Sequence, residues 1–229
     1  MNRPPLAHTS AMFKNNGLSI VLLSLFLLTM AGQALTGWGE HNGDEQAHGR
    51  PAVSFSQYLT TGHFWEATGE NWESEFLQMA MFVLLTTVLY QKGSAESKRI
   101  DVIEEPDLNP RGYRDFPDAP GPVKRGGWQL RLYENSLGLT FVGLFVVSFA
   151  MHAFGGHAAY NNDRTAHGEA PVAVAGYVGS QRFWFESFQN WQSEFLSLAA
   201  MVIATIYLRQ RGSAESKAVH APHSETGRG

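Results

Sequence analysis

The stretch "NWESEFLQMAMFVLLT" at residues 71–86 places glutamates at the start of an apolar run, and "NWQSEFLSLAAMVIAT" at 190–205 nearly repeats it. A shift of 119 residues aligns 13–98 with 132–217 without a gap, and 33 of these 86 positions are identical. Unrelated sequences share far fewer identities over such a length, so one unit is written twice. The repeat predicts a two-helix unit in each range.

Four apolar segments predict membrane helices. The hydrocarbon core of a bilayer is about 30 Å thick and needs roughly 20 helical residues. Two segments reach that length only if their helices begin near Asn71 and Asn190. The predicted spans are 17–36, 71–91, 136–155 and 190–209. We therefore expect an all-α membrane protein with four transmembrane helices, arranged as two tandem hairpins around a pseudo-twofold axis along the membrane normal.

The basic residues predict the topology. Of 17 Lys and Arg residues, 14 lie in 1–16, 92–135 and 209–229, and three lie in the two remaining loops. The positive-inside rule then places both termini and the central loop in the cytoplasm. Segment 99–131 is rich in proline and charge and predicts a flexible cytoplasmic linker, and 218–229 predicts a disordered tail.

Composition and motifs narrow the function. The chain has no cysteine, which excludes disulfides and thiol nucleophiles, and its net charge of -4 argues against a nucleic-acid partner. Nucleophile elbows, phosphate loops and dinucleotide fingerprints are absent from the sequence. We therefore expect a protein without a cofactor that is not an enzyme and acts structurally or through interactions in the lipid bilayer. The protein partner and homo-oligomerisation stay open, and the alternative is a small proton- or ion-conducting protein.

The alternative depends on polar residues that share one depth on the periplasmic side. We expect six residues at this depth. Two are glutamates one turn into the second and fourth spans, two come from the other two spans, and two are asparagines. They are Glu75, Glu194, Gln33, His152, Asn71 and Asn190. Polar groups in membrane helices usually face the interior of the bundle. Helix capping by the asparagines, with the glutamates in the first turn, explains the same pattern without an ion.

A second repeated pattern, "NxDxxxHG", contains Asp44 and His48 in one unit and Asp163 and His167 in the other. Aspartate and histidine four residues apart lie on one face of a helix, which is a spacing that serves metal sites. A capping aspartate, and a histidine before a glycine that ends the helix, account for the pattern equally. Both interpretations stay open.

Several motifs together resemble a known family. They include "HFWEATGENWESEFLQM", "QKGSAESK", "RLYENSL" and "RFWFESFQNWQSEFL". Over residues 13–220 the chain resembles the bacterial membrane proteins grouped as DUF6766, a domain of unknown function. The resemblance implies a location in the inner membrane of a bacterium. It implies no activity and transfers no functional residue, because none is established for that family.

Overall fold

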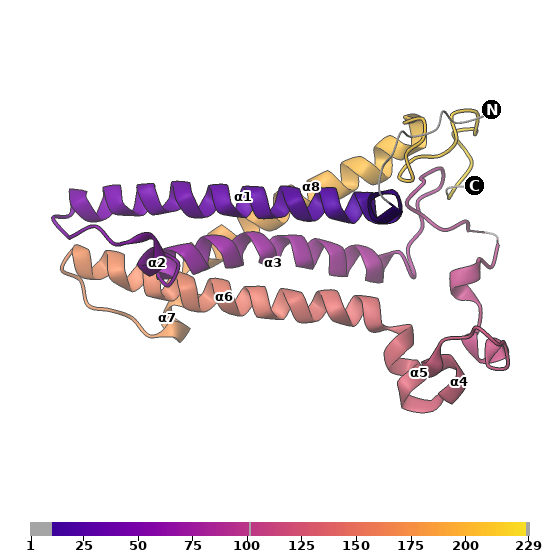
Figure 1. The fold of residues 1–229 in the computed structure, drawn as a ribbon, viewed down its shortest axis with the longest axis horizontal. Helices are drawn as coiled ribbons and strands as arrows, with labels where there is room; N and C mark the ends of the chain where they lie inside the picture. The colour runs from indigo at the N-terminus through magenta and orange to yellow at the C-terminus, as the bar shows by residue number, and fades with distance from the viewer. Residues whose placement is uncertain (1–10, 101, 228–229) are drawn as a thin grey trace.

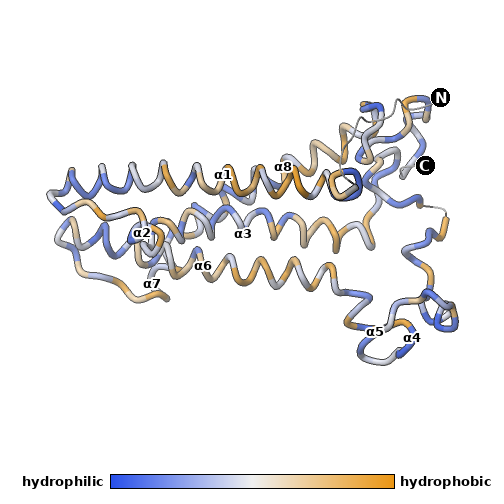
Figure 2. Tube along the Cα trace, in the orientation of Figure 1, coloured by the Kyte–Doolittle hydropathy of each residue, from blue (hydrophilic) through white to orange (hydrophobic). Residues whose placement is uncertain are grey.

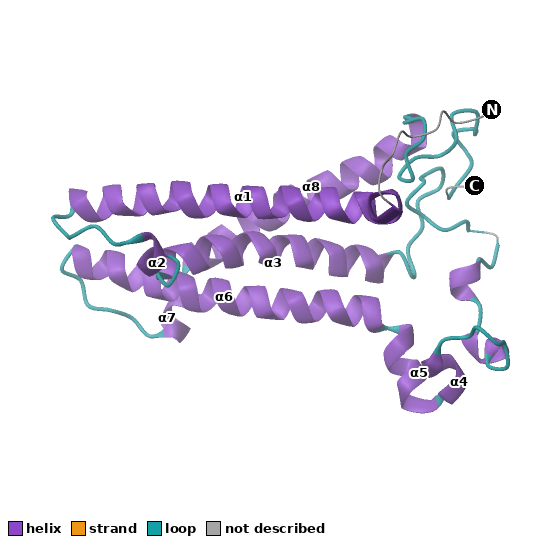
Figure 3. Ribbon diagram, in the orientation of Figure 1, coloured by secondary structure: helices purple, strands orange, loops and turns teal. Residues whose placement is uncertain are grey.

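The computed structural model describes residues 11–100 and 102–227, which form helices joined by loops and contain no strand (Figure 3). The described part does not include residues 1–10, which enter the charge count for the topology. It also leaves out residue 101 of the predicted linker and residues 228 and 229 of the predicted tail. The α-helices are α1 (Ala11–Ala47), α2 (Phe55–Tyr58), α3 (Gly62–Leu85), α4 (Gly121–Arg125), α5 (Gly127–Glu134), α6 (Ser136–Ala166), α7 (Val174–Val178) and α8 (Gln181–Tyr207).

Four long helices make up the body of the protein (Figure 1). Helices α1, α3 and α6 run lengthwise beside one another, and α8 crosses them at an angle. The most extensive contact joins α3 to α6, and the next joins α3 to α8. Helix α1 touches α3 only sparsely. The packing therefore centres on α3, which lies between the other two well-packed helices.

Glycines explain why α3 and α6 approach so closely. A Cβ atom added at Gly155 of α6 would lie 2.5 Å from a backbone nitrogen of α3, and one added at Gly69 would collide with the backbone of α6. Small residues allow this backbone approach between membrane helices. In the repeat, the position equivalent to Gly155 is Thr36 on α1, and the position equivalent to Gly69 is Phe188 on α8. A matching close contact between α1 and α8 is thus blocked by side chains.

Two helices, α1 and α6, are long and apolar enough to cross a bilayer. Only 6% of the apolar window of α1 and 22% of that of α6 is buried, unlike the core helix of a soluble protein. The apolar residues of the long helices lie between a polar end and the polar loops at the other end (Figure 2). Helices α3 and α8 do not meet the same criterion, because their first halves are polar.

The predicted starts of two helices were wrong. Helices α3 and α8 begin nine residues before Asn71 and Asn190, which lie inside them. The side chains of Thr61 and Ser180 are the true N-caps, and each accepts a hydrogen bond from the backbone N–H three residues on. The aromatic segments that follow these caps therefore continue the helix. Glutamates placed in a first turn by the sequence lie well inside their helices.

The outer loops after α1 and α6 fold in the same way. The Asn42 side chain bonds both backbone groups of Val53, and Asn161 does the same with Val172, at 2.8–3.0 Å. These paired bonds bring each loop back onto the helix that it follows. They recur 119 residues apart, as the repeat in the sequence would require, and the division into units 13–98 and 132–217 stays a prediction.

At the inner end, the tail lies against the loop after α3. Lys217 is 2% exposed, and its ammonium donates to the carbonyls of Gly93 at 2.6 Å and Glu225 at 2.7 Å, besides two further tail carbonyls. The Thr226 hydroxyl accepts a hydrogen bond from the backbone N–H of Gly93 at 2.8 Å. Short helices also form within the linker, among them α4 and α5. That the linker is flexible and the tail disordered stays a prediction.

Candidate functional site

Polar residues line the facing sides of α3 and α8 near the outer end. On α3, the spacing of Glu66, Glu70 and Glu73 places three carboxylates on one helix face. On α8, steps of four residues align Arg182, Glu186 and Asn190. An α-helix brings residues three or four apart onto one side, so each set forms a stripe. The two stripes meet beside α6, which adds one histidine.

That histidine, His152, is fully buried at the centre of the cluster. Its Nδ1 lies 2.8 Å from Oε2 of Glu73, which is itself fully buried and accepts a second hydrogen bond from Nε1 of Trp191 at 2.8 Å. The imidazole ring stacks on Phe183 with 4.6 Å between the ring centres. Its other nitrogen, Nε2, has no hydrogen-bond partner and lies 3.6 Å from Oε2 of Glu186.

This arrangement needs an exchangeable proton. If Nδ1–H of His152 donates to ionised Glu73, a neutral ring turns the lone pair of Nε2 toward ionised Glu186. Two acceptors facing each other repel, and burial of Nε2 strengthens the repulsion. A proton shared between Nε2 and Glu186 would remove it.

The buried Tyr177 connects this centre to the outer residues. Its hydroxyl lies 3.1 Å from Oε2 of Glu186 and 3.4 Å from Oε1 of Glu66. Arg182 donates from Nε to Oε1 of Glu186 at 2.8 Å, and its Nη2 lies 3.9 Å from Glu66. A hydroxyl that can both donate and accept thus bridges two carboxylates, and one guanidinium partly neutralises them.

The two outer carboxyls differ in their affinity for protons. Burial, with repulsion from Glu186, raises the pKa of Glu66 from 4.5 to about 7. Burial also acts to raise the pKa of Glu186, but His152 and Arg182 stabilise its charge and hold that pKa below its ordinary value. Both residues lie outside the predicted spans. Near neutral pH, Glu66 exchanges a proton while Glu186 stays ionised.

A family model for a domain of unknown function, DUF6766, matches residues 9–228. The chain belongs to the DUF6766 family. The resemblance seen in the sequence motifs is thereby confirmed. No curated protein and no solved structure matches the chain.

The structure distributes the predicted polar residues of this DUF6766 protein among different neighbours. His152 is the centre of the cluster, and Asn190 joins it through a hydrogen bond to Glu70. Gln33 instead donates to the Thr68 hydroxyl at 3.3 Å, on the side of α3 that faces α1. Asn71 is exposed and bonds the backbone one turn earlier.

The two glutamates of the repeated motif lie away from this centre. Glu75 is exposed and lies two residues, and so more than half a helical turn, from the buried Glu73. Glu194 of α8 is half-buried and close enough to Glu75 for their charges to repel. The backbone carbonyl of Glu194 accepts a hydrogen bond from Gln78 at 2.8 Å. Glu194 thus contacts α3 through its backbone.

Most of the cluster was missed in the sequence. The sequence did not single out five members of the cluster. Four precede the predicted span starts at Asn71 and Asn190, and the fifth lies beside Glu75: Glu66, Glu70, Arg182, Glu186 and Glu73. The signal was present in the spacing, because carboxylates at i, i+4 and i+7 mark one side of a helix. The caps at Thr61 and Ser180 would have extended both helices far enough to reveal it.

A polar cavity of about 440 Å³ adjoins the cluster at the outer end of the helices. Glu66 and Arg182 belong to both the cavity wall and the cluster. Other wall residues carry charge or titrate, among them Asp44, Glu45 and His63. The cavity therefore gives water and small ions a polar approach to the outermost carboxyl of the cluster.

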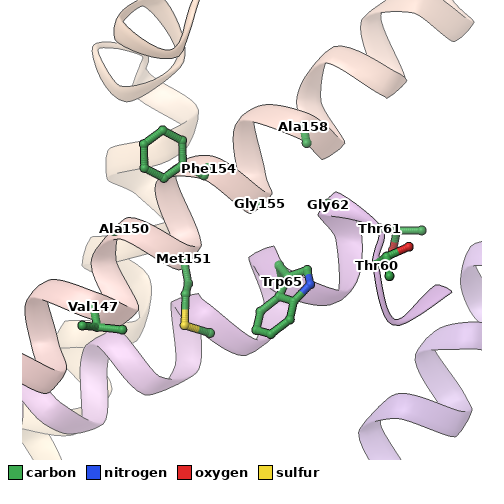
Figure 4. Close-up of a pocket in the computed structure, with 10 residues that line it drawn as sticks. All are labelled: Thr60, Thr61, Gly62, Trp65, Val147, Ala150, Met151, Phe154, Gly155 and Ala158. Atoms are coloured by element: carbon green, nitrogen blue, oxygen red, sulfur yellow. The ribbon is translucent and has the colours of Figure 1, made fainter. Parts of the chain in front are cut away.

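A second cavity, of about 540 Å³, lies between the start of α3 and the middle of α6 (Figure 4). Trp65, Met151 and Phe154 dominate its wall, and the hydroxyls of Thr60 and Thr61 are its few polar side-chain groups. Its lining contains no titratable carboxyl, imidazole or amine. This cavity therefore offers no chemistry for binding an ion or a proton.

Beyond the cluster, α8 makes two separate polar contacts. Gln78 of α3 donates to the Ser197 hydroxyl at 3.0 Å, and the hydroxyls of Thr205 and of Ser94, in the loop after α3, lie 3.0 Å apart. Met201 occupies the turn of α8 between Ser197 and Thr205, at a spacing of four residues from each. Two polar residues of α8 are thus separated by an apolar turn.

Within residues 11–100 and 102–227, no group of three or more histidine, aspartate or glutamate side chains is arranged to hold a metal ion. The weak metal candidates form two pairs. Nδ1 of His48 lies 3.5 Å from Oδ1 of Asp44, and Nδ1 of His167 lies 3.4 Å from Oδ1 of Asp163. Each Nδ1 also lies 2.9 Å from the backbone carbonyl of the same aspartate. The two histidines precede Gly49 and Gly168, which end α1 and α6 at positive φ, as the capping interpretation expects. Its capping aspartates were wrong, because both aspartates lie in the last turn of a helix and not at its start.

Proposed function

We propose that this protein is a four-span inner-membrane protein that conducts protons and is not an enzyme. The spans form two tandem hairpins with both termini in the cytoplasm. The internal repeat, the distribution of basic residues and the exposed apolar surfaces of α1 and α6 support this topology. In this arrangement the polar halves of α3 and α8 face each other in the interior instead of facing lipid.

The observation that carries the proposal is the buried His152 between Glu73 and Glu186. Ionisable side chains inside a membrane protein are costly, and they are retained where they bind or move ions. Here a buried and a partly exposed carboxylate, Glu73 and Glu186, flank one imidazole, at 2.8 and 3.6 Å. An imidazole can take a proton at one nitrogen and release another from the opposite nitrogen, as a proton shuttle requires.

Protons have a route inward from the outer cavity. A proton taken up at Glu66 passes through the Tyr177 hydroxyl to Glu186, then to Nε2 of His152, and leaves Nδ1 for Glu73. The four steps span 3.4, 3.1, 3.6 and 2.8 Å between heavy atoms. Only the step between Glu186 and His152 exceeds hydrogen-bond distance, and a small rotation of either side chain closes it.

We infer an apolar constriction in the inner half of the path. Beyond Glu73 the Gln78 side chain bonds Ser197 of α8, and the next polar contact of α8 is at Thr205, two turns further on and past Met201. An apolar constriction holds back water until it is wetted, which is one way in which channels are gated. We therefore expect slow proton flux that is limited at Met201.

Proton flux into proteoliposomes that contain a pH-sensitive dye tests the proposal, with a potassium gradient and valinomycin setting the voltage. His152→Gln and Glu73→Gln are the test variants, because the positions 119 residues away already hold glutamine within the same kind of helix. Glu75→Gln is the matched control, with the same change two residues from Glu73 at an exposed position. We expect both test variants to abolish the flux and the control to retain it.

Two results would contradict the proposal. Wild-type proteoliposomes that pass no more protons than empty liposomes would leave a structural or interaction role as the better account. Equal flux in wild type and His152→Gln would show that protons cross elsewhere. Size-exclusion profiles of the detergent-solubilised variants check that the fold survives each change.

A further inference from the structure

The outer ends of α1 and α6 bring two histidines together. His48 is the first residue after α1, and His167 is the first residue after α6. Their imidazole rings lie edge to face with 5.4 Å between the ring centres, although the residues are 119 positions apart. Capping of each helix explains the contact of each Nδ1 with its own carbonyl. It does not require the two rings to meet.

Both rings are held in the way that metal-binding histidines usually are. Nδ1 of His48 lies 2.9 Å from the carbonyl of Asp44, and Nδ1 of His167 lies 2.9 Å from that of Asp163. A carbonyl accepts only, so Nδ1 carries the proton in both rings and Nε2 keeps its lone pair. A hydrogen bond from the far ring nitrogen to a carbonyl or carboxylate is the common support for a metal ligand.

The electrostatics at this place favour a cation. The C-terminal ends of α1 and α6 carry partial negative charge, and the carboxylates of Asp44 and Asp163 lie one turn away. The nearby arginines are already paired. Arg50 lies 2.8 Å from Glu45, and Arg164 lies 2.9 Å from Glu169.

We propose that His48 and His167 together bind one divalent transition-metal ion, such as Zn²⁺ or Cu²⁺, through their Nε2 atoms. Two imidazoles bound to one tetrahedral zinc at Zn–N distances of about 2.0–2.1 Å have ring centres roughly 5 Å apart. The observed 5.4 Å is close to that value. The side chains are 30% and 57% exposed, so water completes the coordination. Asp44 and Asp163 orient the rings and do not bind the metal directly.

Zinc titration of the full chain in detergent tests the site, using protein purified without a histidine tag. The variants are His48→Asn and His167→Asn, because the asparagine amide can replace Nδ1–H as the helix-end donor while Nε2 is lost. His220→Asn, at an exposed position on the inner side, is the matched control. We expect one zinc ion per chain in wild type and control. Each test variant should bind zinc at least about tenfold more weakly than wild type. A loss of that size is known for changes to residues that only support a metal ligand.

The nitrogen hyperfine pattern of bound Cu²⁺ gives a second readout, with two imidazole nitrogens expected in wild type and one in each test variant. The same zinc affinity in a double variant, or no zinc binding by wild type at micromolar concentration, would overturn the proposal. Metal binding is measured directly, so this test does not depend on whether the protein conducts protons.

Discussion

Replacing Glu66 with glutamine should change how the stability of the protein depends on pH. The Glu66 side chain is 12% exposed, and burial raises its pKa from 4.5 to about 7. At 1.36 kcal/mol per pH unit, that difference corresponds to about 3 kcal/mol. The adjoining polar cavity screens part of the effect, so we expect about 1–3 kcal/mol.

The sign follows from proton binding. Between pH 4.5 and about 7 the folded protein holds a proton on Glu66 that the unfolded chain has released. The free energy of unfolding therefore falls as pH rises through this window and is level above it. Glutamine cannot ionise and keeps the hydrogen-bonding capacity of the neutral acid. The variant should lack this part of the slope and be more stable than wild type at pH 8.

Thermal unfolding in detergent, followed by circular dichroism at pH 4.5 to 8, measures this effect. A gain of 1 kcal/mol raises Tm by about 2–4 °C for a chain of this size. Glu75→Gln is the control, since Glu75 is exposed on the same helix. Identical pH profiles for Glu66→Gln and wild type would refute the reasoning, because they would mean that Glu66 is ionised in both states.

Three further changes test other parts of the structure. Gly69→Ala should cost about 1–3 kcal/mol in thermal unfolding, because its Cβ would strike the backbone of α6, whereas Gly143→Ala meets open space and should not destabilise. Lys217→Met should expose the tail to limited proteolysis, because it leaves the carbonyls around the buried ammonium without their donor; proteinase K, which does not need lysine or arginine, should cut the tail of wild type more slowly. Met201→Ser should raise proton flux in proteoliposomes by wetting the constriction, and unchanged flux would place the barrier elsewhere.

The sequence predicted the helical class well because membrane helices follow from local composition. Long apolar runs identify α1 and α6 directly, since each apolar window is long enough to cross a bilayer. The ends of the helices were less predictable. At Asn71 and Asn190 the change from polar to apolar residues resembles a helix start, but it marks only where polarity changes along a continuous helix. Hydropathy reports the surroundings of a helix and not its length.

The contacts between helices could be predicted least. Nothing local in the sequence pairs His152 with Glu73, because the two lie 79 positions apart. Their contact depends on the close approach that Gly69 allows, and a glycine in a helix has several other uses. His152 was a candidate on polarity and depth alone, and its carboxylate partners became identifiable only after α3 and α6 were placed side by side.

The position of the cluster also says where function should be sought in an internal repeat. The sequence directed attention to what the two copies share, and the shared glutamates, Glu75 and Glu194, lie outside the cluster. Its central residues, His152, Glu73 and Glu186, occur where the two copies differ. The equivalent positions in the other copy are, in the same order, Gln33, Gln192 and Ala67. Shared positions maintain helix ends, loops and packing in both copies. A single buried cluster of acidic and basic groups needs unlike residues from the two copies, because identical ones would place like charges together.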